Sequence, residues 1–211
     1  LIAILTNCFV PCNGRFPTLI LLSGFFFAGG NPVAAGGFVF LLIVLAVSIT
    51  LLASFLLSKT ILRGVPSAFV LELPPYRRPM LGEVIVRSML DRTIFVLARA
   101  VTVAIPAGAV IWLCQNIMVN GHTLLYGMAT VLEPLGACMG LSGVILMAFL
   151  LGIPANEIVI PILLMVYSQS GTLVEAEGIA QAGAILAANG WTWVTAVCVI
   201  LFSLNHFPCA T

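Results

Sequence analysis

The chain has 211 residues, of which 62% are hydrophobic and 7% are charged, and its formal net charge is +1. Soluble domains carry about 25% charged residues, so the composition excludes an ordinary soluble domain and places the chain in a lipid bilayer. Nucleic-acid binding has no support, because seven of the eight Lys and Arg residues fall between positions 59 and 99. We predict an all-α fold, a polytopic transmembrane helical bundle with discontinuous (broken) helices.

The first apolar segment, residues 1–29, is long enough to span a bilayer. Residues 11–17, Pro-Cys-Asn-Gly-Arg-Phe-Pro, interrupt it and predict two half-segments. Helix breakers and ionisable groups at membrane depth are tolerated only where they are buried in protein or line a wet cavity. The break is therefore a hypothesis for a functional site.

Residues 38–62 form the clearest predicted span, which is followed by a connector rich in proline and basic residues. From residue 82 to 99 the spacing of the charges predicts an amphipathic helix that runs into a span at about 94–114. The positive-inside rule predicts that residues 59–99 are cytoplasmic. We accordingly divide the chain into three parts: membrane segments 1–62, a cytoplasmic connector 63–93, and membrane segments 94–211.

In the remainder of the chain, residues 116–140 are expected at the opposite membrane interface and residues 168–190 in a loop. Residues 141–167 form a membrane segment broken at 152–157 and again at Pro161. A last span is expected from Trp191 to Leu204, with Trp191 and Trp193 as interfacial anchors. It meets a third break at 205–209, Asn-His-Phe-Pro-Cys.

Each of the three breaks combines proline with side chains that can bind a metal ion. Because proline lacks an N–H, the carbonyl four residues earlier loses its helical partner, which predicts bare carbonyls at Asn7, Asn13, Leu150, Glu157 and Leu204. Transporters of small ions use broken helices with unpaired backbone in this way. The candidate metal ligands are Cys12, Asn13, Asn156, Glu157, His206 and Cys209.

Glu157 is the only acidic or basic residue between Glu133 and Glu175, inside an apolar run that predicts a buried carboxylate. Burial without a partner would cost several kcal/mol or force protonation. It is either a cation ligand or proton carrier, or a structural partner of Arg15 or Arg99. The thiols of Cys12 and Cys209 are either soft metal ligands or packing groups. The other cysteines are scattered through apolar segments and are expected to be reduced packing residues: Cys8, Cys114, Cys138 and Cys198. Arg15 is expected to donate to the freed carbonyls or to pair with Glu157.

Four segments, in this order, resemble the FeoB family of bacterial ferrous iron transporters. Residues 6–17 are similar to the end of the family's first Gate motif and residues 71–77 to its cytoplasmic connector. Residues 152–161 are similar to its second Gate region, and residues 206–211 to a segment near its C-terminal end. The resemblance covers nearly the whole chain.

The resemblance implies import of Fe²⁺ across the bacterial cytoplasmic (inner) membrane, with Cys12, Glu157 and Cys209 on the iron path. It also implies a GTPase domain in the same protein, which would bind GTP and Mg²⁺. No GxxxxGK[ST] loop occurs in this sequence, so we expect it to be a piece of a longer protein. Small Feo accessory proteins and further copies of the chain are the other implied partners, besides the lipid bilayer.

Three other classes of function are alternatives to the iron transporter. A Gate-type carrier for nucleosides or another small solute is left open by the amides of Asn13, Asn156 and Asn205. A membrane enzyme is not expected, because neither an HExxH motif nor a serine elbow occurs. A purely structural subunit would explain the spans and leave the three polar breaks unexplained.

Overall fold

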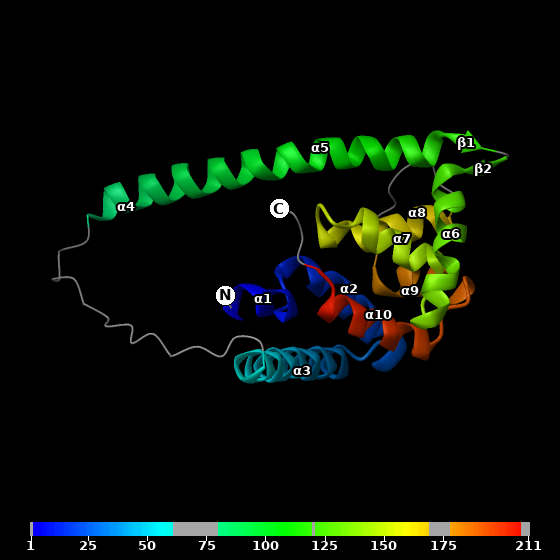
Figure 1. Ribbon diagram of the computed structural model, residues 1–211, viewed down its shortest axis with the longest axis horizontal. Coiled ribbons are helices and arrows are strands. Elements are labelled where there is room, and N and C mark those ends of the chain that lie inside the picture. Colours follow the sequence, from blue (N-terminus) through cyan, green and yellow to red (C-terminus); the bar gives the residue numbers. More distant parts are fainter. Residues whose placement is uncertain (1, 61–79, 120, 169–177, 208–211) are drawn as a thin grey trace.

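The computed structural model describes residues 2–60, 80–119, 121–168 and 178–207 (Figure 1). In these ranges the chain is helical almost throughout, which confirms the predicted all-α membrane fold. Two helices are long and apolar enough to cross a membrane, and the number rises to four if each of two sharply bent helix pairs counts as one span. The predicted discontinuous helices are therefore present.

The first segment is broken where the sequence predicts it. Helix α1 (Ile2–Thr6) continues into the 3-10 turn η1 (Asn7–Phe9), and the chain is then extended around Pro11. A second 3-10 turn, η2 (Asn13–Arg15), leads into α2 (Phe16–Leu22), which ends in a π-helical turn, η3 (Ser23–Phe27). Pro17 lies in the first turn of α2, where a missing N–H costs nothing.

The helix α3 (Pro32–Lys59) is the predicted clear span, and it begins six residues earlier than expected. Asn31 caps it by accepting a hydrogen bond from the N–H of Val33, at 3.1 Å. Proline at the first helical position supports the same start. Most of its side chains are exposed, as a lipid-facing helix requires.

A second long helix runs without interruption from α4 (Leu81–Arg87) through a π-helical turn, η4 (Ser88–Ile94), into α5 (Phe95–Asn116). The expected amphipathic helix and the span that follows it are thus one continuous rod. In Figure 1 this rod lies along one edge of the molecule and α3 along the opposite edge. The connector residues 61–79 lie outside the described residues.

Two bent pairs of short helices fill the space between these edges. A hairpin of β1 (Met118–Val119) and β2 (His122–Thr123) leads into α6 (Leu124–Cys138), which is followed after a bend of 109° by α7 (Gly143–Leu151). The second pair, α9 (Ile179–Ala188) and α10 (Trp193–Asn205), is bent by 113°. Between the pairs lie the 3-10 turn η5 (Asn156–Ile158) and α8 (Val159–Tyr167).

Three local expectations were wrong. Residues 179–188 form α9 and not a loop, because their alanines favour a helix even without charges. Pro161 does not break its segment, since it lies in the first turn of α8, where proline is tolerated. Trp191 is no interfacial anchor: its side chain is buried, and its Nε1 donates to the hydroxyl of Tyr167 at 3.0 Å.

The buried core forms around α7 and α8, the most apolar of the short helices. Ile145, Met147, Ile162, Leu163 and Leu164 are at most 1% exposed. Helices α2, α9 and α10 complete this core with further leucines and alanines. The break between α7 and α8 lies against η2 of the first segment, and α7 contacts α10 of the last segment through Phe149 and Phe202.

Candidate functional site

The three predicted breaks meet at one place in the structure. The amide of Asn156, at the start of η5, contacts Cys12 in the first break, with 3.6 Å between Nδ2 and Sγ. Its Oδ1 lies 3.2 Å from Nε2 of His206, which directly follows α10. Three candidate ligands that are far apart in the sequence therefore form a thiol–amide–imidazole chain.

His206 is held in one orientation by its surroundings. Its Nδ1 lies 2.9 Å from the carbonyl oxygen of Ser203. Phe149, Phe202 and Phe207 surround the imidazole, with ring centroids 5.1–5.8 Å away. The residue is 6% exposed and Asn156 is 4% exposed, so the amide and the imidazole lie inside the protein, whereas Cys12 is partly exposed.

The hydrogen bonds allow two orientations of the Asn156 amide. With Oδ1 toward Nε2 of His206, Nδ2 donates to the sulfur of Cys12. With the amide turned over, its NH₂ group donates to Nε2 and the thiol of Cys12 donates to Oδ1. In either orientation one amide joins the thiol to the imidazole.

Glu157 lies at the edge of this cluster and is exposed, contrary to the expectation of a buried carboxylate. Its side chain covers Gly14: a Cβ atom built on that glycine would lie 3.1 Å from Cγ and 3.5 Å from Oε1. The 3-10 turn η5 explains the exposure, since it directs Asn156 inward and the next residue outward. The carboxylate therefore stands beside the first break.

The other candidate residues have different positions. Asn13 is exposed, in η2. Cys209 lies outside the described residues. In the part of the chain that the structure describes, no group of three or more His, Cys, Asp and Glu side chains could hold a metal ion. A cation at this place would therefore need amide or carbonyl oxygens, water or Cys209 as additional ligands.

Several of the carbonyls that are expected to be bare accept hydrogen bonds from other backbone N–H groups. The carbonyls of Asn7 and Leu150 accept hydrogen bonds from Val10 and Ile153, three residues later. The carbonyl of Asn13 accepts one from Phe16. The 3-10 geometry of the breaks replaces the bonds that proline removes, which corrects the prediction at these positions.

Arg15, which lies in the first break, binds backbone carbonyls just before that break and at the third break. Its Nη1 donates to the carbonyls of Cys8 and Leu204, at 2.9 and 3.2 Å, and its Nη2 donates to those of His206 and Phe207, at 3.0 and 3.3 Å. The sequence predicts that Arg15 donates to freed carbonyls. Its reach to the third break could not be predicted, because 189 or more residues separate the partners.

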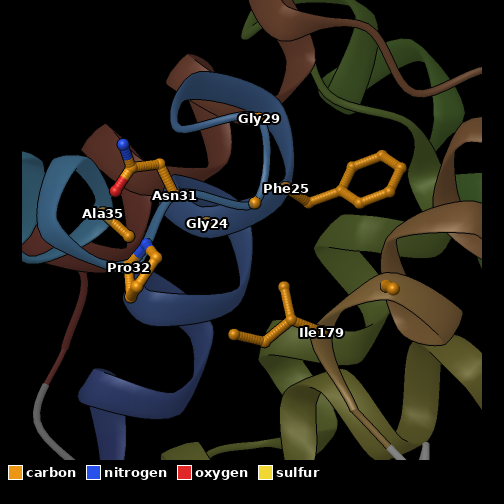
Figure 2. A pocket seen from close by; sticks show the side chains of 9 residues that line it. Gly24, Phe25, Gly29, Asn31, Pro32, Ala35 and Ile179 are labelled. Carbon is orange, nitrogen blue, oxygen red and sulfur yellow. The ribbon is translucent and has the colours of Figure 1, made fainter.

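Two cavities lie away from this cluster, and no candidate ligand lines either of them. One, of about 560 Å³, is mainly apolar and lies between the α2–α3 connection and the start of α9; Figure 2 shows Asn31 and Pro32 on one side of it and Ile179 on another. The other, of about 530 Å³, is more polar and is lined by Gln115, His122, Tyr126, Tyr167 and Asn189, among others. This cavity adjoins Tyr167 at the C-terminal end of α8, whereas Asn156 lies before the N-terminal end of the same helix.

The free thiols are consistent with a reduced protein. Cys8, Cys12, Cys114, Cys138 and Cys198 are all free, as expected from their scattered positions. Cys138 is exposed and is therefore not the packing residue that the sequence suggests. Cys12 is the one among them that contacts the amide–imidazole chain.

Comparison with known proteins finds similarity to ferrous iron transport proteins. The model of the family described as "Ferrous iron transport protein B C terminus" matches residues 39–92. Over 99% of its length the chain is 26% identical to the Fe(2+) transporter FeoB of Methanocaldococcus jannaschii, and over its whole length 27% identical to that of Staphylococcus aureus strain COL. Over 53% of its length it is 34% identical to a Porphyromonas gingivalis protein named as a fusion of Fe(2+) transport protein A and FeoB, 13% of which is covered.

The chain spans about a third of the two FeoB relatives, 31% of each. No solved structure gives a significant match. The matches extend over nearly the whole chain and include the long helix α3 and the helix that begins with α4. The family model and the relatives together support a similarity of this chain to the C-terminal region of FeoB proteins.

Proposed function

We propose that this chain is the membrane permease portion of a GTP-dependent transporter that imports Fe²⁺ across the cytoplasmic membrane. Ferrous iron would exchange its waters for protein ligands where the three breaks meet, and would pass between the broken helices. The ligands are drawn from Cys12, Asn13, Asn156, Glu157, His206 and Cys209, with backbone carbonyls. The chain itself performs no enzymatic step in this proposal.

The contact of Cys12, Asn156 and His206 is the observation that carries the proposal. Thiolate and imidazole suit a borderline transition metal such as Fe²⁺ better than Mg²⁺ or Ca²⁺. A site with few strong protein ligands also suits a cargo that has to leave again. Glu157, exposed beside Gly14, supplies the negative charge that attracts a cation to the same place.

The arrangement in the membrane is part of the proposal. Residues 59–99, rich in Lys and Arg, lie in the cytoplasm, and the protein is a multi-pass protein of the bacterial inner membrane. Residues 1–62 and 94–211 form the membrane parts, and residues 63–93 form the cytoplasmic connector. The division rests on the distribution of charge and on the two long apolar helices.

Partners outside this chain complete the transporter. A GTPase domain of the same protein would bind GTP and Mg²⁺ and hydrolyse the nucleotide. The fusion of an iron transport protein A with FeoB in Porphyromonas gingivalis supports a small Feo accessory protein as a second partner. We also propose further copies of the chain as partners in a homo-oligomer.

Uptake of radioactive iron by cells that produce the full-length protein tests the path. We expect Cys12→Ser, Glu157→Gln and Cys209→Ser each to reduce the rate by about tenfold, the effect of losing one strong ligand contact. Cys114→Ser makes the same chemical change on α5, away from the cluster, and should leave uptake unchanged. Wild-type uptake by all three path variants would contradict the proposal.

The second candidate is a Gate-type carrier for nucleosides or another small solute. The central position of the Asn156 amide favours it, because amides recognise organic solutes by paired hydrogen bonds. The same cells distinguish the two candidates. Nucleoside uptake that is insensitive to iron, and lost in Asn156→Ala, would favour the carrier.

A further inference from the structure

Arg15 is the most deeply buried charged residue near the three breaks. It is 2% exposed, and its guanidinium binds carbonyl oxygens of Cys8, Leu204, His206 and Phe207. Three of these carbonyls belong to His206 itself and to residues that flank it in the chain, Leu204 and Phe207. The side chain thus fixes the backbone that positions His206.

The bonds of Arg15 have a clear physical basis. Helix α10 ends at Asn205, so the last carbonyls of the helix have no intrahelical partner and carry the negative end of the helix dipole. A planar guanidinium can donate along two directions at once, to the first break and to the third. A lysine ammonium keeps the positive charge and loses this fork.

We propose that Arg15 is a positioning residue for the ion path: it ties the backbone of the third break to the first and so holds the imidazole of His206 on Asn156, next to Cys12. The role in transport rests on the proposed function, whereas the tie between the breaks does not. Arg15 itself does not bind the cation, because its charge repels one. Its effect on transport passes through His206.

The tie can be measured without iron, by the reactivity of Cys12 in the purified full-length protein. With peptide-resolved mass spectrometry, we expect Arg15→Lys to raise the rate of maleimide labelling of Cys12 by about tenfold, since His206 no longer holds the Asn156 amide against the thiol. Arg99→Lys, the same change on an exposed arginine of α5, should have no effect. Unchanged labelling of Cys12 in a folded Arg15→Lys protein would overturn the proposal.

Cys198 reports in the same sample whether the variant is folded. It packs against the bend between α6 and α7, where a Cβ on Gly140 would lie 3.0 Å from its Sγ. If both Cys12 and Cys198 become reactive, the Arg15→Lys variant has unfolded. A cross-linking experiment that keeps Arg15 then tests whether the first and third breaks lie together. Phe207→Cys and the native Cys8 should then be joined by a short bismaleimide, and failure to join them would contradict the tie.

Uptake measurements test the role of Arg15 through His206. In the full-length transporter we expect Arg15→Lys to raise KM for Fe²⁺ by about tenfold, and to add little in a His206→Ala background, because the two residues act as a unit. Additive effects of the two variants would overturn the positioning role. Increased Cys12 labelling with no effect on iron uptake would retain the tie and contradict the proposed iron path.

Discussion

At the scale of single residues, the neutral amide of Asn156 is the centre of the candidate site. It contacts both Cys12 and His206, whereas the only carboxylate of the second break is exposed at the edge. A buried amide both donates and accepts, so it can bind two neighbours at once. Removal of Asn156 should therefore disturb both potential ligands together.

We predict that Asn156→Ala reduces iron uptake more than Asn13→Ala does. The first variant leaves the imidazole and the thiol without their shared partner, at a cost of about 1–3 kcal/mol. The second removes an exposed amide in η2. Uptake rates of the two full-length variants, normalised to the amount in the membrane, check the order, and equal rates would show that Asn156 has no special role.

The composition of the site could be predicted from the sequence, and its connections could not. Proline beside polar groups in apolar segments indicated the three segments that meet at Cys12, Asn156 and His206. The contacts between them join residues 144 and 50 positions apart, and no local pattern encodes such a pairing. Glu157 was expected to be buried because it lies in an apolar run, but the 3-10 turn η5 leaves it exposed.

At the scale of elements, the two bent helix pairs are connected by turns of the same kind. Gly140 and Gly190 both have positive φ, 70° and 83°, and each is followed by a buried apolar residue and then by a helix cap. The caps are Ser142 and Thr192, whose side chains accept hydrogen bonds from the N–H groups of Ile145 and Thr195. The same Gly-x-Ser/Thr sequence thus makes both bends.

The bend between α6 and α7 depends on close contact of their backbones. A Cβ on Gly143 would lie 2.0 Å from the carbonyl oxygen of Ala129 and 2.8 Å from the backbone N of Glu133. The carboxylate of Glu133 accepts a hydrogen bond from the N–H of Gly143, at 2.6 Å, and so caps α7 across the bend. Even one methyl group at this position would have to displace backbone.

We predict that Gly143→Ala lowers the melting temperature of the full-length protein in detergent, with a loss of about 1–3 kcal/mol from overpacking. Gly127→Ala provides the matched control on α6, because nothing lies within 4 Å of its Cβ position. That variant should be neutral or slightly stabilising, since alanine favours a helix. Thermal unfolding followed by fluorescence compares them, and equal melting temperatures would exclude the close contact.

Long apolar runs predicted their helices well, and short ones did not. The span at α3 and the helix from residue 82 onward were expected from hydropathy and charge alone. The helix α9 was missed because a short run of alanine and glycine shows neither period nor charge. The prediction that Trp191 is an interfacial anchor is wrong because its side chain contacts Tyr167, and this contact depends on tertiary structure.

At the scale of the whole molecule, two long helices enclose the short broken ones. Helix α3 has 28 residues and so extends about 42 Å, more than the roughly 30 Å of hydrocarbon in a bilayer. The rod of α4, η4 and α5 returns along the opposite edge (Figure 1). If Lys59 and Arg87 are cytoplasmic, the hairpin of β1 and β2 faces the other side of the membrane.

This topology predicts the side from which two introduced cysteines react. Ser58→Cys, beside Lys59 at the end of α3, should be labelled by a membrane-impermeant maleimide in inverted vesicles and not in intact spheroplasts. Met118→Cys, 73% exposed as methionine in β1, should show the reverse. Peptide-resolved mass spectrometry separates both from the native cysteines, and labelling of both sites from one side would require α5 to enter and leave the membrane on the same face.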